Sequence, residues 1–338
     1  MISSQFISDC TIRILIDRMW IRLSSMVAFS AVMATAFASM GCKGNPPGTV
    51  PSATEPHRLG GQNGLVAVSS QYTVGDAKAR LQQAIAANDK LSTIAEIDHA
   101  SNAAGVGLQL DPTEVILFGN PALGTPLMQV NQKTGIDLPQ KMLFAADSRG
   151  TTVVMYNDPE YLRQRHGLDE AASQLATMTR AMSGLAHKSS GHAVAPGDSG
   201  ISPQQGLIVT KSAHSVDETY RRLEAAIEGA GPLRVLARLD HRANAQTVGL
   251  TLRPTRLLVF GNPALGTRLM QKKQSIGLDL PQKFLVYEDG AGDVFIVHND
   301  PHYLAARHGI TDGGDILATI ANALNKLAAA ASSTGSAL

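Results

Sequence analysis

Few of the residue types that nucleic-acid binding or thiol chemistry requires occur in this chain. Of its 338 residues only two are cysteines, and aromatic residues make up 4%. The 29 basic and 28 acidic side chains leave a formal net charge of +1. Such a chain lacks both the positive charge that follows a phosphate backbone and the aromatic rings on which bases stack. We therefore expect no nucleic-acid partner.

The two cysteines, Cys10 and Cys42, both lie ahead of the part of the chain that is expected to fold. That part therefore contains no disulfide, no thiolate metal site and no cysteine nucleophile. The sequence also lacks a glycine-rich phosphate loop and the H-E-x-x-H and G-x-S-x-G motifs. We expect neither a metal ion nor a cofactor and assign no catalytic residue, so an enzymatic activity is disfavoured.

The N-terminal region has the features of an export signal. Arg18 and Arg22 precede an uncharged run of small and apolar residues, Leu23 to Met40. The run ends in Ala-Ser-Met-Gly-Cys42, which resembles the lipobox of bacterial lipoproteins, in which the cysteine is acylated. This resemblance implies a signal over residues 1–42 and a lipid anchor on Cys42. The exported protein would then lie at the periplasmic face of a bacterial membrane.

Two alternatives remain open for this region. The apolar run is about as short as a membrane span can be, roughly 17 residues, so it can also act as a spanning anchor. Ala36-Phe37-Ala38 offers an ordinary cleavage site that would leave Cys42 as a free thiol. Residues 43–63 follow with much proline, glycine, serine and threonine and no apolar period, which predicts a flexible tether.

The remainder of the chain contains one pattern twice. FGNPALGT occurs at 118–125 and at 260–267, and both copies continue with G-x-DLPQK and NDP-x-YL-x-x-RHG. Each residue of the second copy lies 142 positions after its counterpart, without a gap. Such a repeat predicts two similar domains, which we place at 64–182 and 206–331. The segment 183–205 between them, rich in glycine, serine, histidine and proline, is predicted to be a linker.

The apolar periodicity of each copy predicts an α+β fold. In the second copy, the alternation over 233–239 is typical of a strand with one buried face, and Ser215 and Glu218 form a capping box at a helix start. The predicted order is β-α-β-β-β-β-α, an antiparallel sheet with helices on one face. Pro263 is expected to open a helix, whereas Pro126 lies inside the corresponding helix of the first copy and should kink or shorten it.

The repeated motifs FGNPALGT-x-LMQ, G-x-DLPQK and NDP-x-YL-x-x-RHG resemble the bacterial domain-of-unknown-function family 302. The resemblance covers essentially both repeats. It implies a TBP-like β-α-β(4)-α sheet, often found as a dimer, and it implies no reaction, substrate or cofactor. Because domains that dimerise as single copies often occur in tandem, we expect the two repeats to form an intramolecular pseudo-dimer. The expected contact is through sheet edges or the apolar face of the last helix.

The predicted strand order brings several polar residues of each repeat to one edge of the sheet. The third and fifth strands end where the fourth begins, because successive antiparallel strands alternate in direction. Two helix N-termini open at the same edge and present free N–H groups that can hold an anion. The candidate ligand-binding residues are Asn120, Asp137, Lys141 and Asn157 in the first repeat and Asn262, Asp279, Lys283 and Asn299 in the second. The competing interpretation is structural, with helix caps, turns and a solvated lysine.

Histidines at matched positions form a second candidate set. His99 and His241 follow aspartates, and His166 and His308 follow arginines. An imidazole that a carboxylate orients can serve as a metal ligand or in acid–base chemistry. However, His99 follows the second strand, at the sheet edge opposite the Asn-Lys residues, and His166 ends a helix, where a cation complements the free carbonyl groups. We therefore predict structural roles for these histidines.

Two functional hypotheses follow. The first is a non-catalytic envelope module that binds a small ligand or an envelope protein in each repeat. The second is an enzyme that acts on a small anionic substrate, with Lys141 and Lys283 stabilising the negative charge. A concave pocket at the Asn-Lys edge with both lysines pointing into it would favour the enzyme, since a merely structural lysine should point to solvent.

Overall fold

The computed structural model of the chain describes residues 63–195 and 200–334. The export signal predicted over 1–42, with the lipid attachment at Cys42, lies outside these residues, as does all of the predicted tether except Asn63. Within the described residues, no helix is both long enough and apolar enough to cross a membrane.

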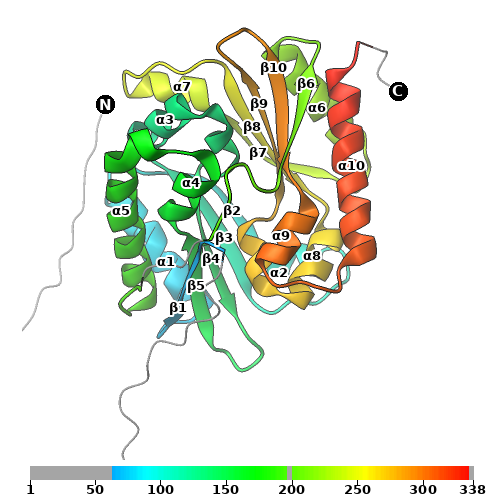
Figure 1. Ribbon diagram of the computed structural model, residues 1–338. Helices are drawn as coiled ribbons and strands as arrows, with labels where there is room; N and C mark the ends of the chain where they lie inside the picture. The colour runs from blue at the N-terminus through cyan, green and yellow to red at the C-terminus, as the bar shows by residue number, and fades with distance from the viewer. Residues whose placement is uncertain (1–62, 196–199, 335–338) are drawn as a thin grey trace, which may run out of the picture. The chain divides into compact units, whose positions relative to one another are not determined.

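Each repeat forms five strands joined by helices (Figure 1). The first repeat contains β1 (Leu65–Ser70), α1 (Val74–Ala86), β2 (Ser92–Asp98), α2 (His99–Ala104), β3 (Thr113–Gly119), α3 (Pro121–Val130), the 3-10 helix η1 (Gln132–Ile136), β4 (Gln140–Ala146), β5 (Thr152–Asn157), α4 (Pro159–His166), the 3-10 helix η2 (Asp169–Ala171) and α5 (Ala172–Ser190). The second contains β6 (Leu207–Ser212), α6 (Val216–Glu228), β7 (Arg234–Asp240), α7 (His241–Thr247), β8 (Thr255–Gly261), α8 (Pro263–Lys272), the 3-10 helix η3 (Gln274–Leu278), β9 (Gln282–Glu288), β10 (Val294–Asn299), α9 (Pro301–Arg307) and α10 (Gly314–Ser332).

The strands of each repeat form one antiparallel sheet. The order across the sheet is β1-β5-β4-β3-β2 in the first repeat and β6-β10-β9-β8-β7 in the second. Apart from the short helices between strands, the order along the chain is β-α-β(4)-α in both repeats. This confirms the predicted α+β class and the predicted sheet.

The long helices cover only one face of each sheet (Figure 1). In the first repeat, Leu81 of α1 and Met182 of α5 belong to one buried cluster with Phe144 of β4. In the second repeat, Leu223 of α6 lies in the equivalent cluster with Phe284 of β9. Each repeat therefore has its own core between its sheet and its helices.

The opposite faces of the two sheets pack against each other. A third buried cluster joins Leu117 and Leu143 of the first sheet to Val259 and Leu285 of the second. The layers are thus helix, sheet, sheet and helix. We expected contact through sheet edges or through the last helix, and the contact through sheet faces corrects that expectation. The reason lies in the strands, because every residue of β4 is buried, and a strand that is apolar on both sides needs cover on both faces.

Helices α3 and α8 begin as the sequence predicts, but α3 is not shortened at Pro126. Asn120 and Asn262 cap the two helices, and a proline follows each of them. Both helices contain 10 residues, so Pro126 does not shorten α3. A proline removes one hydrogen bond from a helix interior. Leu127 and Met128, which follow it, are buried in the core, and this packing holds the last turn in place.

The first repeat ends later than predicted. Helix α5 continues to Ser190, beyond the predicted end of the domain at residue 182. Leu185 and Ala186 are buried on this helix and continue the helical spacing that begins before Met182. The serine, glycine and histidine content of this segment predicts a linker, but the segment keeps one apolar face and forms the end of the helix.

Candidate functional site

The predicted ligand-binding residues separate onto the two faces of each sheet, because side chains alternate between faces along a strand. In β4, Met142 and Phe144 belong to the core under the helices, whereas Lys141 bonds to the other repeat. Asn157 at the end of β5 also bonds to the other repeat. Asn120, in contrast, caps α3 on the helix-covered side. The structure therefore brings Lys141 and Asn157 together and leaves Asn120 elsewhere, and the second repeat divides its residues in the same way.

We call the polar group between the two sheets the interface cluster. Every member is at most 4% exposed. The members are Asp137, Lys141, Asn157, Arg165 and His166 from the first repeat and Asp279, Lys283, Asn299, Arg307 and His308 from the second. Six of the eight predicted ligand-binding residues therefore lie here, beside arginines and histidines of the RHG motif.

Arg165 links the two repeats. Its Nη1 donates to Asp137 Oδ2 at 2.8 Å, and its Nη2 donates to Asn299 Oδ1 of the other repeat at 2.7 Å. His166 Nε2 lies 2.8 Å from the same oxygen of Asp137. Burial raises the pKa of the Asp137 carboxyl, but Arg165, His166 and Lys141 together outweigh burial and hold this pKa well below its usual range. The carboxylate is therefore charged, and it is compensated by fixed neighbours.

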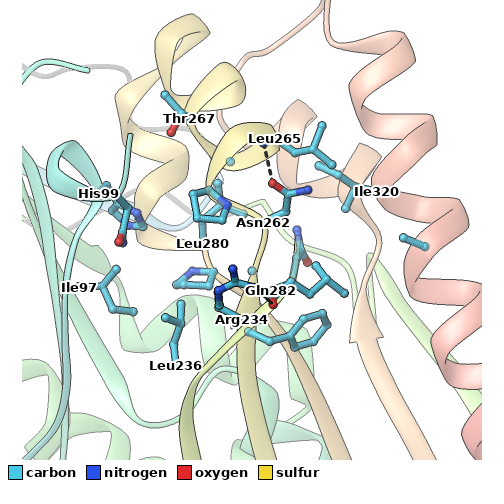
Figure 2. Close-up of a pocket in the computed structure, with 18 of the residues that line it drawn as sticks. Ile97, His99, Arg234, Leu236, Asn262, Leu265, Thr267, Leu280, Gln282 and Ile320 are labelled. Carbon is cyan, nitrogen blue, oxygen red and sulfur yellow. Dashed lines mark hydrogen bonds between the residues drawn. The ribbon is translucent and has the colours of Figure 1, made fainter. Parts of the chain in front are cut away.

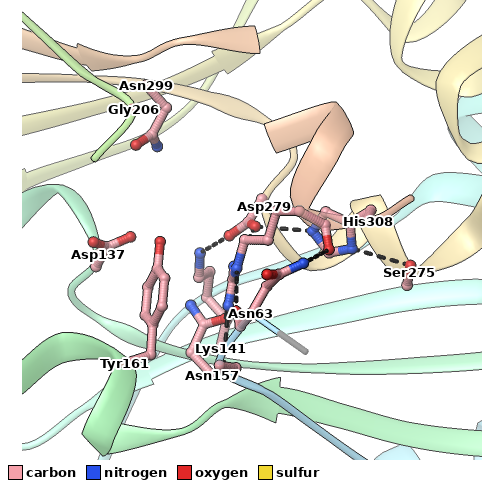
Figure 3. Close-up of polar contacts among 12 residues, drawn as sticks. Asn63, Asp137, Lys141, Asn157, Tyr161, Gly206, Ser275, Asp279, Asn299 and His308 are labelled. Atoms are coloured by element: carbon pink, nitrogen blue, oxygen red, sulfur yellow. Dashed lines mark hydrogen bonds and ion pairs between the residues drawn. The ribbon is translucent and has the colours of Figure 1, made fainter. Parts of the chain in front are cut away.

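Arg307 makes the counterpart contacts from the second repeat, to Asp279 and Asn157, both of which are labelled in Figure 3. Its Nη1 donates to Asp279 Oδ2 at 2.5 Å, and its Nη2 donates to Asn157 Oδ1 of the first repeat at 2.9 Å. His308 Nε2 lies 2.9 Å from Asp279 Oδ2, and its Nδ1 lies 3.0 Å from Ser275 Oγ. Through these reciprocal bonds, the asparagine and the arginine of each NDP-x-YL-x-x-RHG motif connect the two repeats.

The two lysines of the cluster differ in their hydrogen-bond partners. Lys141 Nζ donates across the interface to Asp279 Oδ1 at 3.1 Å. Lys283 Nζ donates to the backbone carbonyl of Asp279 at 3.1 Å. Burial and, to a lesser degree, the nearby Lys141 lower the pKa of Lys283 to about 7, although Asp279 and Asp137 raise it. Both ammonium groups are enclosed between the sheets and neither points to solvent.

The glycine of the G-x-D segment permits the close approach of the two repeats. A Cβ added to Gly135 would lie only 2.8 Å from Leu285 Cδ1 of the other sheet. The carbonyl of Gly277, its counterpart, lies 3.2 Å from His99 Nε2, and the carbonyl of Gly135 lies 3.3 Å from His241 Nε2. Because a carbonyl only accepts, Nε2 of each histidine carries the proton.

A pocket lies on the helix-covered side of each sheet. The first-repeat pocket has a volume of about 260 Å³ and the second-repeat pocket about 120 Å³. The walls of each come from the FGNPALGT segment, the LPQ segment and the last helix of the repeat, and they include Asn120 or Asn262. The two pockets are thus counterparts, built from residues 142 positions apart.

Each pocket is completed by the other repeat. Ile97 and His99 of the first repeat line the second-repeat pocket, near Asn262 (Figure 2). Leu239 and His241 of the second repeat line the first-repeat pocket. We expected His99 at the sheet edge opposite the asparagines. That holds within its own repeat, but the packing of the two sheets brings it to the pocket of the other.

The pocket walls are mainly apolar and carry a few polar atoms without protein partners. Thr125 Oγ1 and Thr267 Oγ1 are counterparts, each in a residue that is 1% exposed, and neither makes a hydrogen bond within the described part of the chain. Gln282 Oε1 in the second-repeat pocket also lacks a partner there. A buried polar atom without a partner costs about 1–3 kcal/mol.

The two pocket histidines are uncharged at neutral pH. Burial lowers the pKa of His99 to about 4, although the bond to Gly277 raises it in part. Burial likewise lowers the pKa of His241 to about 4, against the bond to Gly135. Each imidazole therefore gives its pocket a polar, neutral wall. Among the described residues, no group of three or more His, Cys, Asp or Glu side chains could hold a metal ion.

Most residues that line the two pockets are not among the predicted ligand-binding residues. Caps and turns explain the asparagine, proline and glycine of FGNPALGT, but they do not explain why Phe118, Thr125 and Gln140 recur unchanged in the second copy. All three line the first-repeat pocket, as their counterparts line the second. Side chains that are identical in both copies although no cap or turn requires them are the signal that could have identified the site.

Three curated proteins of Brucella are similar to part of the chain. Fluoride-specific ion channel FluC 1 of Brucella suis biovar 1 (strain 1330) is 48% identical over 111 residues, which are 33% of this chain and 43% of that protein. FluC 1 of Brucella abortus biovar 1 (strain 9-941) and FluC 2 of Brucella melitensis biotype 1 are 48% identical over the same length, which covers 41% of each. The chain thus spans less than half the length of these relatives.

Two further comparisons concern the domain itself. The crystal structure of an uncharacterized conserved protein DUF302 from Bacillus stearothermophilus matches 36% of this chain and 95% of that chain, at 23% identity and a TM-score of 0.34. The family model described as "Domain of unknown function DUF302" matches residues 66–185 and 208–329. These two ranges correspond to the two repeats. The chain therefore belongs to the DUF302 family and carries two copies of its domain in tandem.

Proposed function

We propose that each repeat binds a small, mainly apolar ligand in its pocket without catalysing a reaction. The observation that carries this proposal is the pair of counterpart pockets, each walled by the repeated FGNPALGT and LPQ segments and completed by a histidine of the other repeat. Apolar walls with a few convergent polar groups are typical of small-molecule sites. Because both repeats contribute to each pocket, binding also depends on the contact between them.

The groups in the pockets support binding more than catalysis. Within the described residues, no aspartate, glutamate, lysine or cysteine lines either pocket. The histidines are weak bases, because their pKa is about 4, and their Nε2 protons are used in bonds to the backbone. A general base works best when its pKa lies near the working pH. The enzyme hypothesis required Lys141 and Lys283 in a pocket, and both lie in the interface cluster instead.

A ligand screen by thermal shift tests the proposal on the soluble chain from which residues 1–42 are removed, since every strand and helix of both repeats is retained. A ligand at 100 times its Kd should stabilise the fold by about 2.7 kcal/mol, which raises Tm by several degrees. Ala181 and Ala323, on the last helices, line the two pockets. Tryptophan at these positions should fill the pockets, so the double variant should lose the shift.

Matched controls exist on the same helices. Ala176 and Ala318 are exposed and line neither pocket, so tryptophan there should leave the shift unchanged. A ligand that shifts the Ala181→Trp/Ala323→Trp double variant as much as the unmodified chain would place binding elsewhere. If no small molecule shifts the unmodified chain, an envelope protein becomes the better assignment.

We further propose that the protein is exported and held at the periplasmic face of a bacterial membrane by a lipid on Cys42. The support is the basic and apolar N-terminal sequence, the lipobox-like Ala-Ser-Met-Gly-Cys42 and the polar segment that follows. Replacing Cys42 with serine should block processing and release the protein from the membrane fraction, and globomycin should cause the precursor to accumulate. Unchanged processing and attachment in both experiments would contradict a lipid anchor.

The channel activity that the names of the Brucella relatives state is not part of this proposal. The similar region makes up only 41–43% of those proteins, so the activity that their names state cannot be assigned to that region. Similarity to part of a protein supports a shared domain, and function has to be argued from the site.

A further inference from the structure

The two pockets are not equivalent, although they occupy matched positions. Most of their lining residues are identical between the repeats. Their charge differs at one position, where Ser92 of the first-repeat pocket corresponds to Arg234 of the second. Because no carboxylate of the described residues lines either pocket, Arg234 gives the second-repeat pocket an unbalanced positive charge.

The guanidinium of Arg234 is held by the backbone and is not neutralised. Arg234 begins β7 and pairs with Gly261 of β8, at the end of the sheet where the pocket lies. Its Nη1 donates to the carbonyl of Gly231 at 2.7 Å and to that of Leu233 at 2.9 Å. Both bonds use the same nitrogen, and in the described part of the chain Arg234 forms no ion pair. Its remaining N–H groups are therefore available to an anion.

A second, independent difference frees an amide in the same pocket. In the first-repeat pocket, Gln140 Nε2 donates to Met178 Sδ at 3.0 Å. The second repeat has Ile320 in place of this methionine, and Gln282 Oε1 has no partner within the described residues although Gln282 is only 8% exposed. Because Ile320 has no acceptor atom, the Nε2 of Gln282 makes no hydrogen bond within the described residues and can donate to a ligand, whereas its Oε1 only accepts. Figure 2 shows Arg234 and Gln282 among the residues that surround this pocket.

Asn262 adds a third donor, and the volume of the pocket limits the size of the ligand. Its Oδ1 accepts from the backbone N–H groups of Ala264 at 3.0 Å and Leu265 at 3.4 Å, which leaves its NH₂ group for other partners. The volume of about 120 Å³ is close to that of an apolar cavity that holds benzene, about 150 Å³. The apolar part of a ligand would therefore be of the order of one six-membered ring.

We propose that the second-repeat pocket selects a small amphiphile with a carboxylate head and a ring-sized apolar body, and that the first-repeat pocket selects an uncharged ligand. The carboxylate would bond to Arg234, Gln282 and Asn262. The larger first-repeat pocket, which has Ser92 in place of the arginine, offers no charge to an anion. This inference rests on the proposed function, because it names the ligand class of one of the two pockets.

Titration calorimetry of the soluble chain with benzoate and with benzyl alcohol tests the inference, because the two probes share a ring and differ in charge. Arg234→Ser gives the second-repeat pocket the residue of the first, and it should weaken benzoate binding by about tenfold or more, as expected for the loss of a charged hydrogen bond. Ala323→Trp should abolish benzoate binding, whereas Ala181→Trp should not change it. Arg238→Ser, an exposed arginine of the same strand that lines neither pocket, is the matched control and should have no effect.

The outcomes separate the inference from the proposed function. Benzoate binding that survives Arg234→Ser, or that is lost in Ala181→Trp rather than Ala323→Trp, overturns the charge selection. If benzyl alcohol binds both pockets and benzoate binds neither, the pockets bind ligands as proposed but the carboxylate assignment is wrong. If neither probe binds, and neither tryptophan variant alters any ligand detected by thermal shift, both the inference and the proposed function are wrong.

Discussion

Replacing Arg165 with methionine is expected to lower the free energy of unfolding by about 3–5 kcal/mol. Arg165 is fully buried, and its guanidinium bonds to the Asp137 carboxylate in its own repeat and to Asn299 in the other. Methionine fills part of the same volume but leaves Asp137 as a buried charge without its closest cation. Urea or guanidinium denaturation of the soluble chain, with linear extrapolation to water, measures the loss.

Two further variants make this prediction specific. Arg163 lies on the same helix, is 36% exposed and pairs with Glu160 at the surface. Its replacement by methionine should therefore cost less than about 1 kcal/mol. Arg307→Met should match Arg165→Met, because Arg307 bonds to Asp279 and Asn157 in the counterpart geometry. Equal, small losses at the buried and the exposed positions would contradict the role assigned to the interface cluster.

Features whose causes lie within a few residues could be predicted from the sequence. The Oγ of Ser215 accepts from the backbone N–H of Glu218 at 3.3 Å, as the capping pattern indicates. Asn262 caps α8, and Pro263 is its first residue. The alternation over 233–239 corresponds to β7, a strand with exposed and half-buried residues in turn. Local hydrogen bonds and the period of two determine these features, so no distant residue was needed to predict them.

Features that depend on contact between the repeats could not be predicted in the same way. The bond between Lys141 and Asp279 joins residues 138 positions apart, and the one between His99 and Gly277 joins residues 178 apart. Two similar sheets can meet through edges or through faces, and a local pattern does not choose between these arrangements. The sequence contained one indication of face-to-face packing. β4 is buried along its whole length, whereas a sheet that helices cover on one side only needs just one apolar face.

The pockets combine both kinds of information. Their walls come largely from the repeated motifs, so the sequence contained the residues of the site but not the enclosed volume. The separation of Asn120 from Lys141 follows from the faces to which the strands direct their side chains, although both residues lie near one end of the sheet. The strand order therefore predicted which residues lie near the same end of the sheet. Which of these residues contact one another depends on the face of the sheet to which each side chain points.

The second large effect concerns pH, and we expect the folded chain to lose stability as the pH falls from about 6.5 to 4. His99 and His241 have a pKa of about 4 in the folded chain because they are buried, against an ordinary value of 6.5. A histidine whose pKa is lower in the folded chain binds protons more readily in the unfolded chain. Its contribution to the free energy of unfolding is therefore complete above pH 6.5 and is lost as the pH approaches 4. At pH 4.5 each histidine should cost about 2–3 kcal/mol relative to pH 7.

Denaturation midpoints of the soluble chain at pH 7 and pH 4.5 measure this loss, and a His99→Gln/His241→Gln variant assigns it. Glutamine can still donate to the carbonyls of Gly277 and Gly135 but does not titrate, so the variant should show a much smaller difference between the two pH values. Part of the dependence should remain, because burial also lowers the pKa of His166 and His308 in the interface cluster. The exposed His302 is the control, and its replacement by glutamine should leave the dependence intact. An unchanged dependence in the double variant would mean that these two histidines are not held neutral between the repeats.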